Sequence, residues 1–152
     1  MTIQSSVSRK ATLAESFIGE FVPRFAPGGK LVYVRGGNDP CDGAALQNLG
    51  MDVDLPEIMP DLIFHDAARD WLLIVECASG KHLIDEMRLE ELQRVLSQAG
   101  PDLIYVTAFQ SRSNLADYAD LPAWGSHAWF ADEPDRMMHF DGSRFLGPYA
   151  PG

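Results

Sequence analysis

The chain has 152 residues, of which 46% are hydrophobic and 22% are charged. This composition is ordinary for a soluble globular protein, and it excludes the disordered, collagenous and membrane-spanning classes. The length favours a single domain over residues 1–152 that buries a substantial core.

The charge balance is acidic, with 22 Asp and Glu against 12 Lys and Arg and a formal net charge of −10. A free-standing DNA-binding module usually carries an excess of Lys and Arg, because neutralising phosphates drives its affinity. Any binding of nucleic acid must therefore use a local basic patch or depend on another domain or chain.

The N-terminal sequence and the two cysteines bear on the cellular compartment. The first residues contain no apolar run of signal-peptide type, and no window approaches 18 consecutive apolar residues. Cys41 and Cys77 fit a reducing compartment, and they are too few and too badly placed for a zinc site. We expect a cytoplasmic protein that has no membrane partner.

The N-terminal half is predicted to contain a helix, a strand and a hairpin. Apolar residues at helical spacing predict a helix over 13–25, ended by Pro23 and by the turn residues 26–29. Alternating residues predict a strand over 30–35. Residues 61–76 have the pattern of two apolar strands joined by a tight polar turn.

The C-terminal half is predicted to continue with a helix over 83–100, which has the clearest helical pattern in the chain. The run 103–109 is almost entirely apolar, as expected of a strand covered on both faces. Further strands are predicted over 127–131 and 136–140, and short helices over 44–49 and 113–118. The apolar stripe of the long helix consists of Ile84, Met87, Leu92, Val95, Leu96 and Ala99.

This order of elements predicts the fold class. A strand–helix–strand unit that follows a hairpin implies a mixed sheet, because hairpin strands are antiparallel and crossover strands are parallel. Helices are expected on both faces of this sheet. We therefore predict a three-layer α/β domain.

The hairpin over 61–76 carries an acid at each outer end. If it folds about the centre of residues 67–70, Asp61 lies opposite Glu76 on the same face, with Cβ atoms roughly 4.5–5.5 Å apart. Two carboxylates at this distance repel each other unless a proton or a cation lies between them. A divalent metal with oxygen ligands would fit there.

A simpler interpretation of the two acids stays open at this point. Both could be exposed acids at strand ends, solvated or paired with Lys81 or Arg88. Lys81, just beyond the hairpin, is equally a candidate for orienting a hydrolytic water or stabilising charge on a phosphate, and His82 is ambiguous. The remaining histidines alternate with apolar strand residues and are interpreted as structural; they are His65, His127 and His139.

The hairpin PDLIFHDAARDWLLIVECASGKH closely resembles that of PD-(D/E)xK nucleases. More specifically, the chain is similar to the catalytic domain of the BsuBI/PstI family of type II restriction endonucleases over about 21–149. The similarity rests on four segments in order: FVPRFAPGGKLVY, MPDLIFHDAARDWLLIVE, LIYVTAF and WFADEPDRMMHFDGSRFLGPY.

The resemblance implies a restriction-endonuclease-like fold and Mg²⁺-dependent cleavage of double-stranded DNA, with Mn²⁺ as an alternative ion. Asp61 and Glu76 match the two family acids that hold the metal, and the main-chain carbonyl of Cys77 is a further candidate ligand. Glutamates of the N-terminal helix often support the metal in this fold, and Glu15 and Glu20 are the candidates.

Three departures from the family pattern bear on activity. Ala78 stands where the generic motif has its lysine, although the named family also tends to lack that lysine. A downstream Lys-Arg pair of the family is replaced by Met87-Arg88, which leaves Lys81 as the expected charge-stabilising residue and Arg88 as the reserve. Family enzymes also have an N-terminal DNA-binding domain of winged-helix type, and we expect this sequence to lack it, either as a fragment or as a minimal homologue that has a separate targeting partner.

Two functions are therefore carried forward from the sequence. The first is a metal-dependent endonuclease of restriction type, which uses Asp61, Glu76 and Lys81. Its expected partners are double-stranded DNA, a separate DNA-targeting chain or domain, a cognate DNA methyltransferase and a second copy of the chain. The alternative is a catalytically inactive nuclease-fold module that binds or regulates within a defence system.

Overall fold

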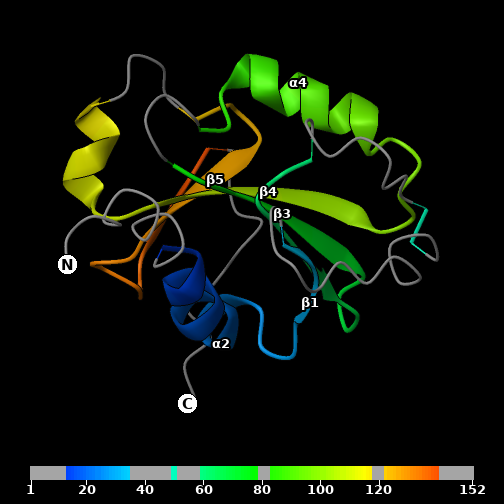
Figure 1. Ribbon diagram of the computed structural model, residues 1–152, viewed down its shortest axis with the longest axis horizontal. Coiled ribbons are helices and arrows are strands. Elements are labelled where there is room, and N and C mark those ends of the chain that lie inside the picture. The colour runs from blue at the N-terminus through cyan, green and yellow to red at the C-terminus, as the bar shows by residue number, and fades with distance from the viewer. Residues whose placement is uncertain (1–12, 35–48, 51–58, 79–82, 118–121, 141–152) are drawn as a thin grey trace, which may run out of the picture.

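The computed structural model describes residues 13–34, 49–50, 59–78, 83–117 and 122–140 (Figure 1). Within these ranges six strands form one sheet in the order β1-β2-β3-β4-β5-β6. The strands are β1 Lys30–Val34, β2 Leu62–Asp66, β3 Trp71–Cys77, β4 Asp102–Phe109, β5 Ser126–Phe130 and β6 Met137–His139. The helical elements are η1 Phe17–Phe21, α2 Val22–Phe25, α4 Glu86–Val95 and η2 Arg112–Asp117.

The sheet is mixed, as the sequence predicted. β1, β2 and β3 pair antiparallel, β3, β4 and β5 pair parallel, and β6 returns antiparallel to β5. α4 lies in the crossover between β3 and β4, which are parallel neighbours and cannot be joined by a tight turn. Figure 1 shows the N-terminal helix on one side of the sheet and α4 on the other, so the three-layer α/β prediction is confirmed.

The hairpin β2–β3 buries both of its faces, each in a different core. Leu62 and Phe64 pack with the N-terminal helix in one cluster, whereas Ile63 and Ile74 pack with α4 in another. Neighbouring residues of a strand point to opposite faces, so a two-sided core requires a nearly continuous apolar run. This explains why the two acids at the hairpin's end are its unusual feature.

The N-terminal helix covers residues 13–25 as predicted, but it continues through Pro23, which was expected to help end it. Residues 13–16, η1 and α2 run on without a break to Phe25. Proline normally clashes with the carbonyl four residues earlier. Here the preceding turn is a wider π-helical one, in which the Val22 N–H donates to the Phe17 carbonyl, and this widening accommodates the ring.

Aromatic packing fixes the N-terminal helix to the sheet. The Phe17 ring stacks on the Phe21 ring with centroids 4.2 Å apart, and it meets the Trp129 ring edge-on at 5.5 Å. Edge-to-face and offset pairs of this kind add to the free energy of burial. The helix therefore contacts β5, two strands beyond the hairpin in the strand order, as well as the hairpin itself.

The helix α4 is shorter than predicted and begins at a cap. The Asp85 side chain accepts a hydrogen bond from the Arg88 N–H at 2.9 Å, so the helix starts at Glu86. Ile84 lies before the helix, where the Asp85 N–H donates to the Leu83 carbonyl at 3.0 Å. Met87, predicted in the apolar stripe, is 81% exposed, and Leu89 is buried instead.

The other predicted short helices have different outcomes. The helix predicted over 113–118 corresponds to the 3₁₀ helix η2 over Arg112–Asp117, and residue 118 lies outside the described ranges. The helix expected over 44–49 falls on residues 44–48, which are also outside those ranges, and on a turn at Leu49. None of the helices that the structure describes is long and apolar enough to cross a membrane.

We predict that Leu92→Ala lowers the free energy of unfolding by about 2–5 kcal/mol, because Leu92 is fully buried under α4. Met87→Ala in the same helix is the matched control and should change it by less than about 0.5 kcal/mol. Chemical denaturation of both variants tests the position of the apolar stripe. Equal costs at the two positions would contradict it.

Candidate active site

The two acids predicted to face each other lie at the same end of the hairpin. The pairs Leu62↔Val75 and Ile63↔Ile74 confirm the expected register within the strands. Asp61 comes just before β2, where its N–H donates to the Val75 carbonyl, and its carboxylate lies close enough to Glu76 to raise the pKa of that residue. Both side chains are buried, with Asp61 6% exposed and Glu76 5% exposed. The simpler interpretation is therefore wrong in expecting exposed, solvated acids, but the pairing with Arg88 that it allowed is present at Glu76.

The backbone of β3 holds Asp61 in place. The Asp61 N–H donates to the Val75 carbonyl at 3.0 Å, and Asp61 Oδ2 accepts a hydrogen bond from the Cys77 N–H at 2.8 Å. In an extended strand the N–H and C=O of one residue point to the same edge. The Cys77 carbonyl therefore points to the edge where Asp61 lies, while its side chain is buried in the core.

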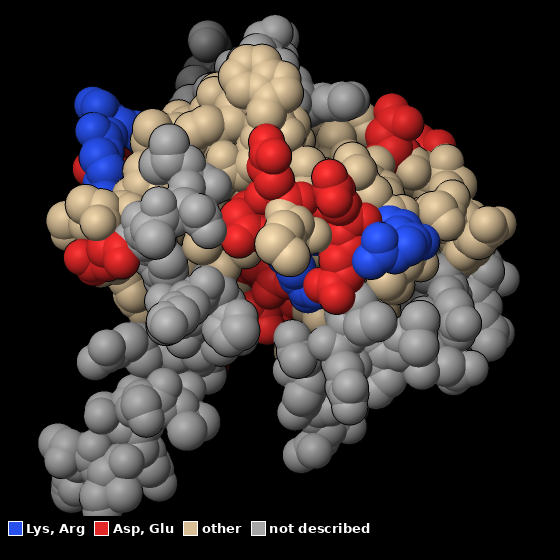
Figure 2. All heavy atoms as spheres, turned by 90° about the horizontal axis from the view of Figure 1, so that it is seen from above, with Lys and Arg blue, Asp and Glu red and all other residues tan. Residues whose placement is uncertain are grey.

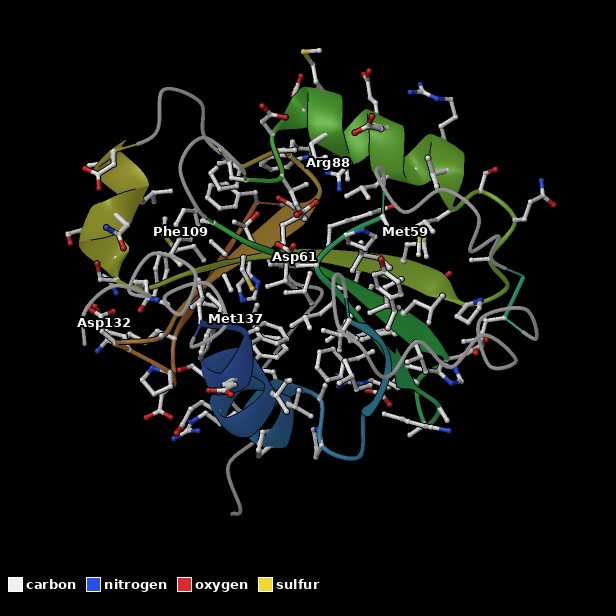
Figure 3. The ribbon with its side chains drawn as sticks, viewed as in Figure 1. Met59, Asp61, Arg88, Phe109, Asp132 and Met137 are labelled. Carbon is white, nitrogen blue, oxygen red and sulfur yellow. The ribbon has the colours of Figure 1, made fainter. Side chains whose placement is uncertain are left out.

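The Arg88 side chain extends from α4 toward the end of the hairpin where Asp61 lies, as Figure 3 shows. Its Nε donates to Glu76 Oε2 at 2.6 Å, and its Nη2 lies 2.5 Å from the same oxygen. The guanidinium also donates to Glu91 Oε1 at 2.6 Å and to the Met59 carbonyl at 3.2 Å. Arg88 thus joins β3, α4 and the segment before β2.

A buried threonine fixes the approach to α4. Thr107 in β4 pairs with Glu76 in register, and its Oγ1 accepts a hydrogen bond from the Ile84 N–H at 3.0 Å. The Ile84 carbonyl accepts from the Ala123 N–H at 2.8 Å. These bonds hold the residues just before the Asp85 cap, and they therefore fix the position of the first turn of α4, which carries Arg88.

The electrostatics of the pair follow from burial. Burial and the neighbouring Asp61 carboxylate raise the pKa of Glu76 from its ordinary value of 4.5 to about 7, although Arg88 opposes the shift. Ionising both of two neighbouring buried carboxylates is unfavourable in free energy, because little water solvates their charges. The pair therefore attracts a proton or a cation beyond the single positive charge of Arg88.

The donors present suit a hard divalent cation. Two carboxylates and a nearby carbonyl supply only oxygen, which is what Mg²⁺ and Ca²⁺ prefer, and Mg²⁺ commonly takes one or two protein carboxylates and keeps several waters. Within the described ranges no three His, Cys, Asp or Glu side chains gather as a metal cluster.

Several predicted residues are not brought to this end of the hairpin. Glu15 and Glu20 are exposed on the N-terminal helix, which packs on the opposite face of the sheet, and Glu20 pairs with Arg24 at 2.7 Å. Lys81 and His82 lie outside the described residues. His127 and His139 pair across β5 and β6, with their Nδ1 atoms 2.9 Å apart.

The surface above α4 is acidic where it is described. Figure 2 shows Asp and Glu side chains gathered in the middle of this face, with few Lys or Arg among them. Glu86 and Glu90 are exposed there. A DNA duplex is therefore not expected to lie along α4 itself, since its phosphates would meet like charges.

We predict that the acid pair makes the metal-free protein less stable as the pH rises from about 5 to 8. The folded protein binds an extra proton below the raised pKa of Glu76, so the free energy of unfolding falls as that proton leaves. Glu76→Gln should flatten this dependence. Its free energy of unfolding should therefore rise by on the order of 2 kcal/mol relative to that of the wild type between pH 5 and pH 8. Thermal unfolding in the presence of a chelator measures both slopes.

Glu90→Gln makes the same chemical change at an exposed position of α4 and should keep the wild-type slope. An unaltered slope in Glu76→Gln would show that the raised pKa belongs to another group.

Comparison with known proteins identifies a family. A sequence model of the BsuBI/PstI restriction endonuclease domain matches residues 1–143. The type II restriction enzyme BsuBI of Bacillus subtilis is 36% identical over 140 residues, which are 90% of this chain and 44% of that protein. The type II restriction enzyme AplI of Arthrospira platensis is 27% identical over 108 residues, which are 69% and 33% of the two chains.

The comparison with solved structures supports the same family relationship. The structure of SdaI restriction endonuclease has a TM-score of 0.79 and 34% identity to this chain, and the match covers 93% of this chain and 46% of that one. The chain spans less than half the length of each of these relatives.

Proposed function

Because the chain belongs to the BsuBI/PstI restriction endonuclease family, we propose that it hydrolyses phosphodiester bonds of double-stranded DNA in a Mg²⁺-dependent, site-specific reaction. The observation that carries this proposal is the buried pair of Asp61 and Glu76 at the end of the β2–β3 hairpin. Two acids without water around them are costly to a fold, and a divalent cation between them would offset that cost.

The residues proposed to hold the ion are Asp61, Glu76 and the main-chain carbonyl of Cys77. Support for the carbonyl comes from the neighbouring N–H of the same residue, which donates to Asp61 Oδ2. Mn²⁺ would suit the same oxygen donors. When bound, the ion supplies a water of lowered pKa and stabilises negative charge on the phosphate.

Lys81 is the proposed charge-stabilising residue, because it follows the end of β3 by only a few positions. A lysine there would hold a phosphate oxygen or orient the attacking water. Arg88 is less suited to that task, since its guanidinium already donates to Glu76, Glu91 and the Met59 carbonyl. Its nitrogens would have to leave these acceptors before they bound a phosphate.

The proposed partners follow from the family and the charge. Double-stranded DNA is the substrate, and a separate targeting domain or chain would supply basic surface that this acidic chain lacks in bulk. A cognate methyltransferase would protect the host's own sites, and two copies related by a two-fold axis would cut both strands symmetrically. Reducing conditions in the cytoplasm would suit the two cysteines.

The family relationship favours a nuclease over an inactive binding module, because the acid pair that matches the family motif is retained and buried. An inactive module would have no use for a destabilising pair of buried acids. Substitution of either acid could then accumulate freely and would even raise stability.

We predict that Asp61→Asn and Glu76→Gln each reduce Mg²⁺-dependent cleavage of plasmid DNA by about 100-fold or more, since each removes a charged ligand but keeps the shape of the side chain. Glu90→Gln, on the exposed face of α4, should cleave like the wild type. The measurement is the rate of conversion of supercoiled to nicked and linear DNA. Equal rates for wild type and either acid variant would refute the site.

A further inference from the structure

We propose that Arg88 is the resident counter-cation of the acid pair, and that it exchanges its contact with Glu76 for a bound divalent cation and thereby limits the affinity of the site for that cation. This inference rests on the proposed function for the presence of a metal. In this inference Arg88 balances the charge of the acids and positions Glu76. It does not replace the missing lysine of the motif.

The contact between Arg88 and Glu76 is concentrated on one oxygen. Nε and Nη2 both approach Oε2, at 2.6 Å and 2.5 Å. The side chains are 17% and 6% exposed, so solvent screens their attraction only weakly. A cation that binds Glu76 must therefore approach a carboxylate that already has a close positive neighbour.

Arg88 has other acceptors that allow the exchange. Its Nη1 donates to Glu91 Oε1 at 2.6 Å, and its Nη2 donates to the Met59 carbonyl at 3.2 Å. If the Glu76 carboxylate bound a metal and released the guanidinium, Arg88 would keep these two contacts. A buried arginine with no acceptor would be costly, and these acceptors avoid that cost.

The charges around the site also suit a divalent ion. Asp61, Glu76 and Glu91 carry three negative charges when ionised, and Arg88 carries one positive charge, so these four groups sum to −2. A divalent cation would bring them to neutrality. Arg88 would still repel it at short range, because like charges interact strongly where water is excluded.

The exchange makes a directional prediction about the arginine. Arg88→Gln should bind Mg²⁺ at least about tenfold more tightly than the wild type at pH 8, because a close positive charge is removed. Arg88→Lys keeps the charge and should bind like the wild type. Arg94→Gln, exposed in the last turn of the same helix, removes an equal charge away from the acids and should also bind like the wild type.

Calorimetric titration of each protein with Mg²⁺, and separately with Mn²⁺, measures these affinities without reference to cleavage. Circular dichroism checks that each variant is folded. If Arg88→Gln is too unstable for titration, the rise in its melting temperature on adding Mg²⁺ replaces the affinity, since a ligand that binds only the folded state stabilises it. That rise should exceed the rise in the wild type.

The outcomes separate this inference from the proposed function. Binding by the wild type with equal or weaker binding by Arg88→Gln would overturn the exchange and leave the metal-dependent nuclease standing. Tighter binding by Arg88→Gln that Arg88→Lys reproduces would show that the charge is not what matters, and it too would overturn the exchange. Failure of both the wild type and Arg88→Gln to bind either ion would overturn the exchange and the metal-dependent function together.

Discussion

Two buried carboxylates held close together at the end of the β2–β3 hairpin are the constraint on which this domain depends. Asp61 and Glu76 would separate if their side chains could turn to solvent, but both belong to a hairpin whose two faces are covered. Asp61 is further held by the Cys77 N–H, and Glu76 by Arg88. The packing of the fold thus maintains a repulsion that the fold itself does not need, which is typical of a site that has been organised for binding.

The hairpin was predictable because its information is local. A tight polar turn between two nearly continuous apolar runs fixes the pairing of β2 with β3. The turn bears this out: Asp66 accepts a hydrogen bond from Arg69 Nε at 2.8 Å, and Asp70 adopts a positive φ of 58°. Opposing acids then follow from counting residues.

The helices were less predictable in detail. Met87 was placed in the apolar stripe because its spacing was counted from Ile84. Ile84 is not part of the helix, since the cap at Asp85 starts the helix at Glu86. Pro23 was expected to stop a helix on local grounds, but packing of the aromatic rings against the sheet outweighs that preference. A local cap thus decided the first case and tertiary packing decided the second.

The charge partner of the site could be named from the sequence but not placed. Arg88 is 12 residues from Glu76 and 29 from Met59, and no local rule connects these positions. Its neighbour Glu91 is different, because residues three apart on a helix face each other, and that contact follows from spacing.

The cap at Asp85 also governs how this family can vary in length. A helix turns by roughly 100° and rises about 1.5 Å per residue, so one residue inserted between Asp85 and Arg88 would rotate the arginine away from the sheet. Only the residues from the cap onward have to keep this helical phase. Natural insertions and deletions should therefore collect before the cap, and the four residues from Asp85 to Arg88 should keep a fixed length across relatives that share this site.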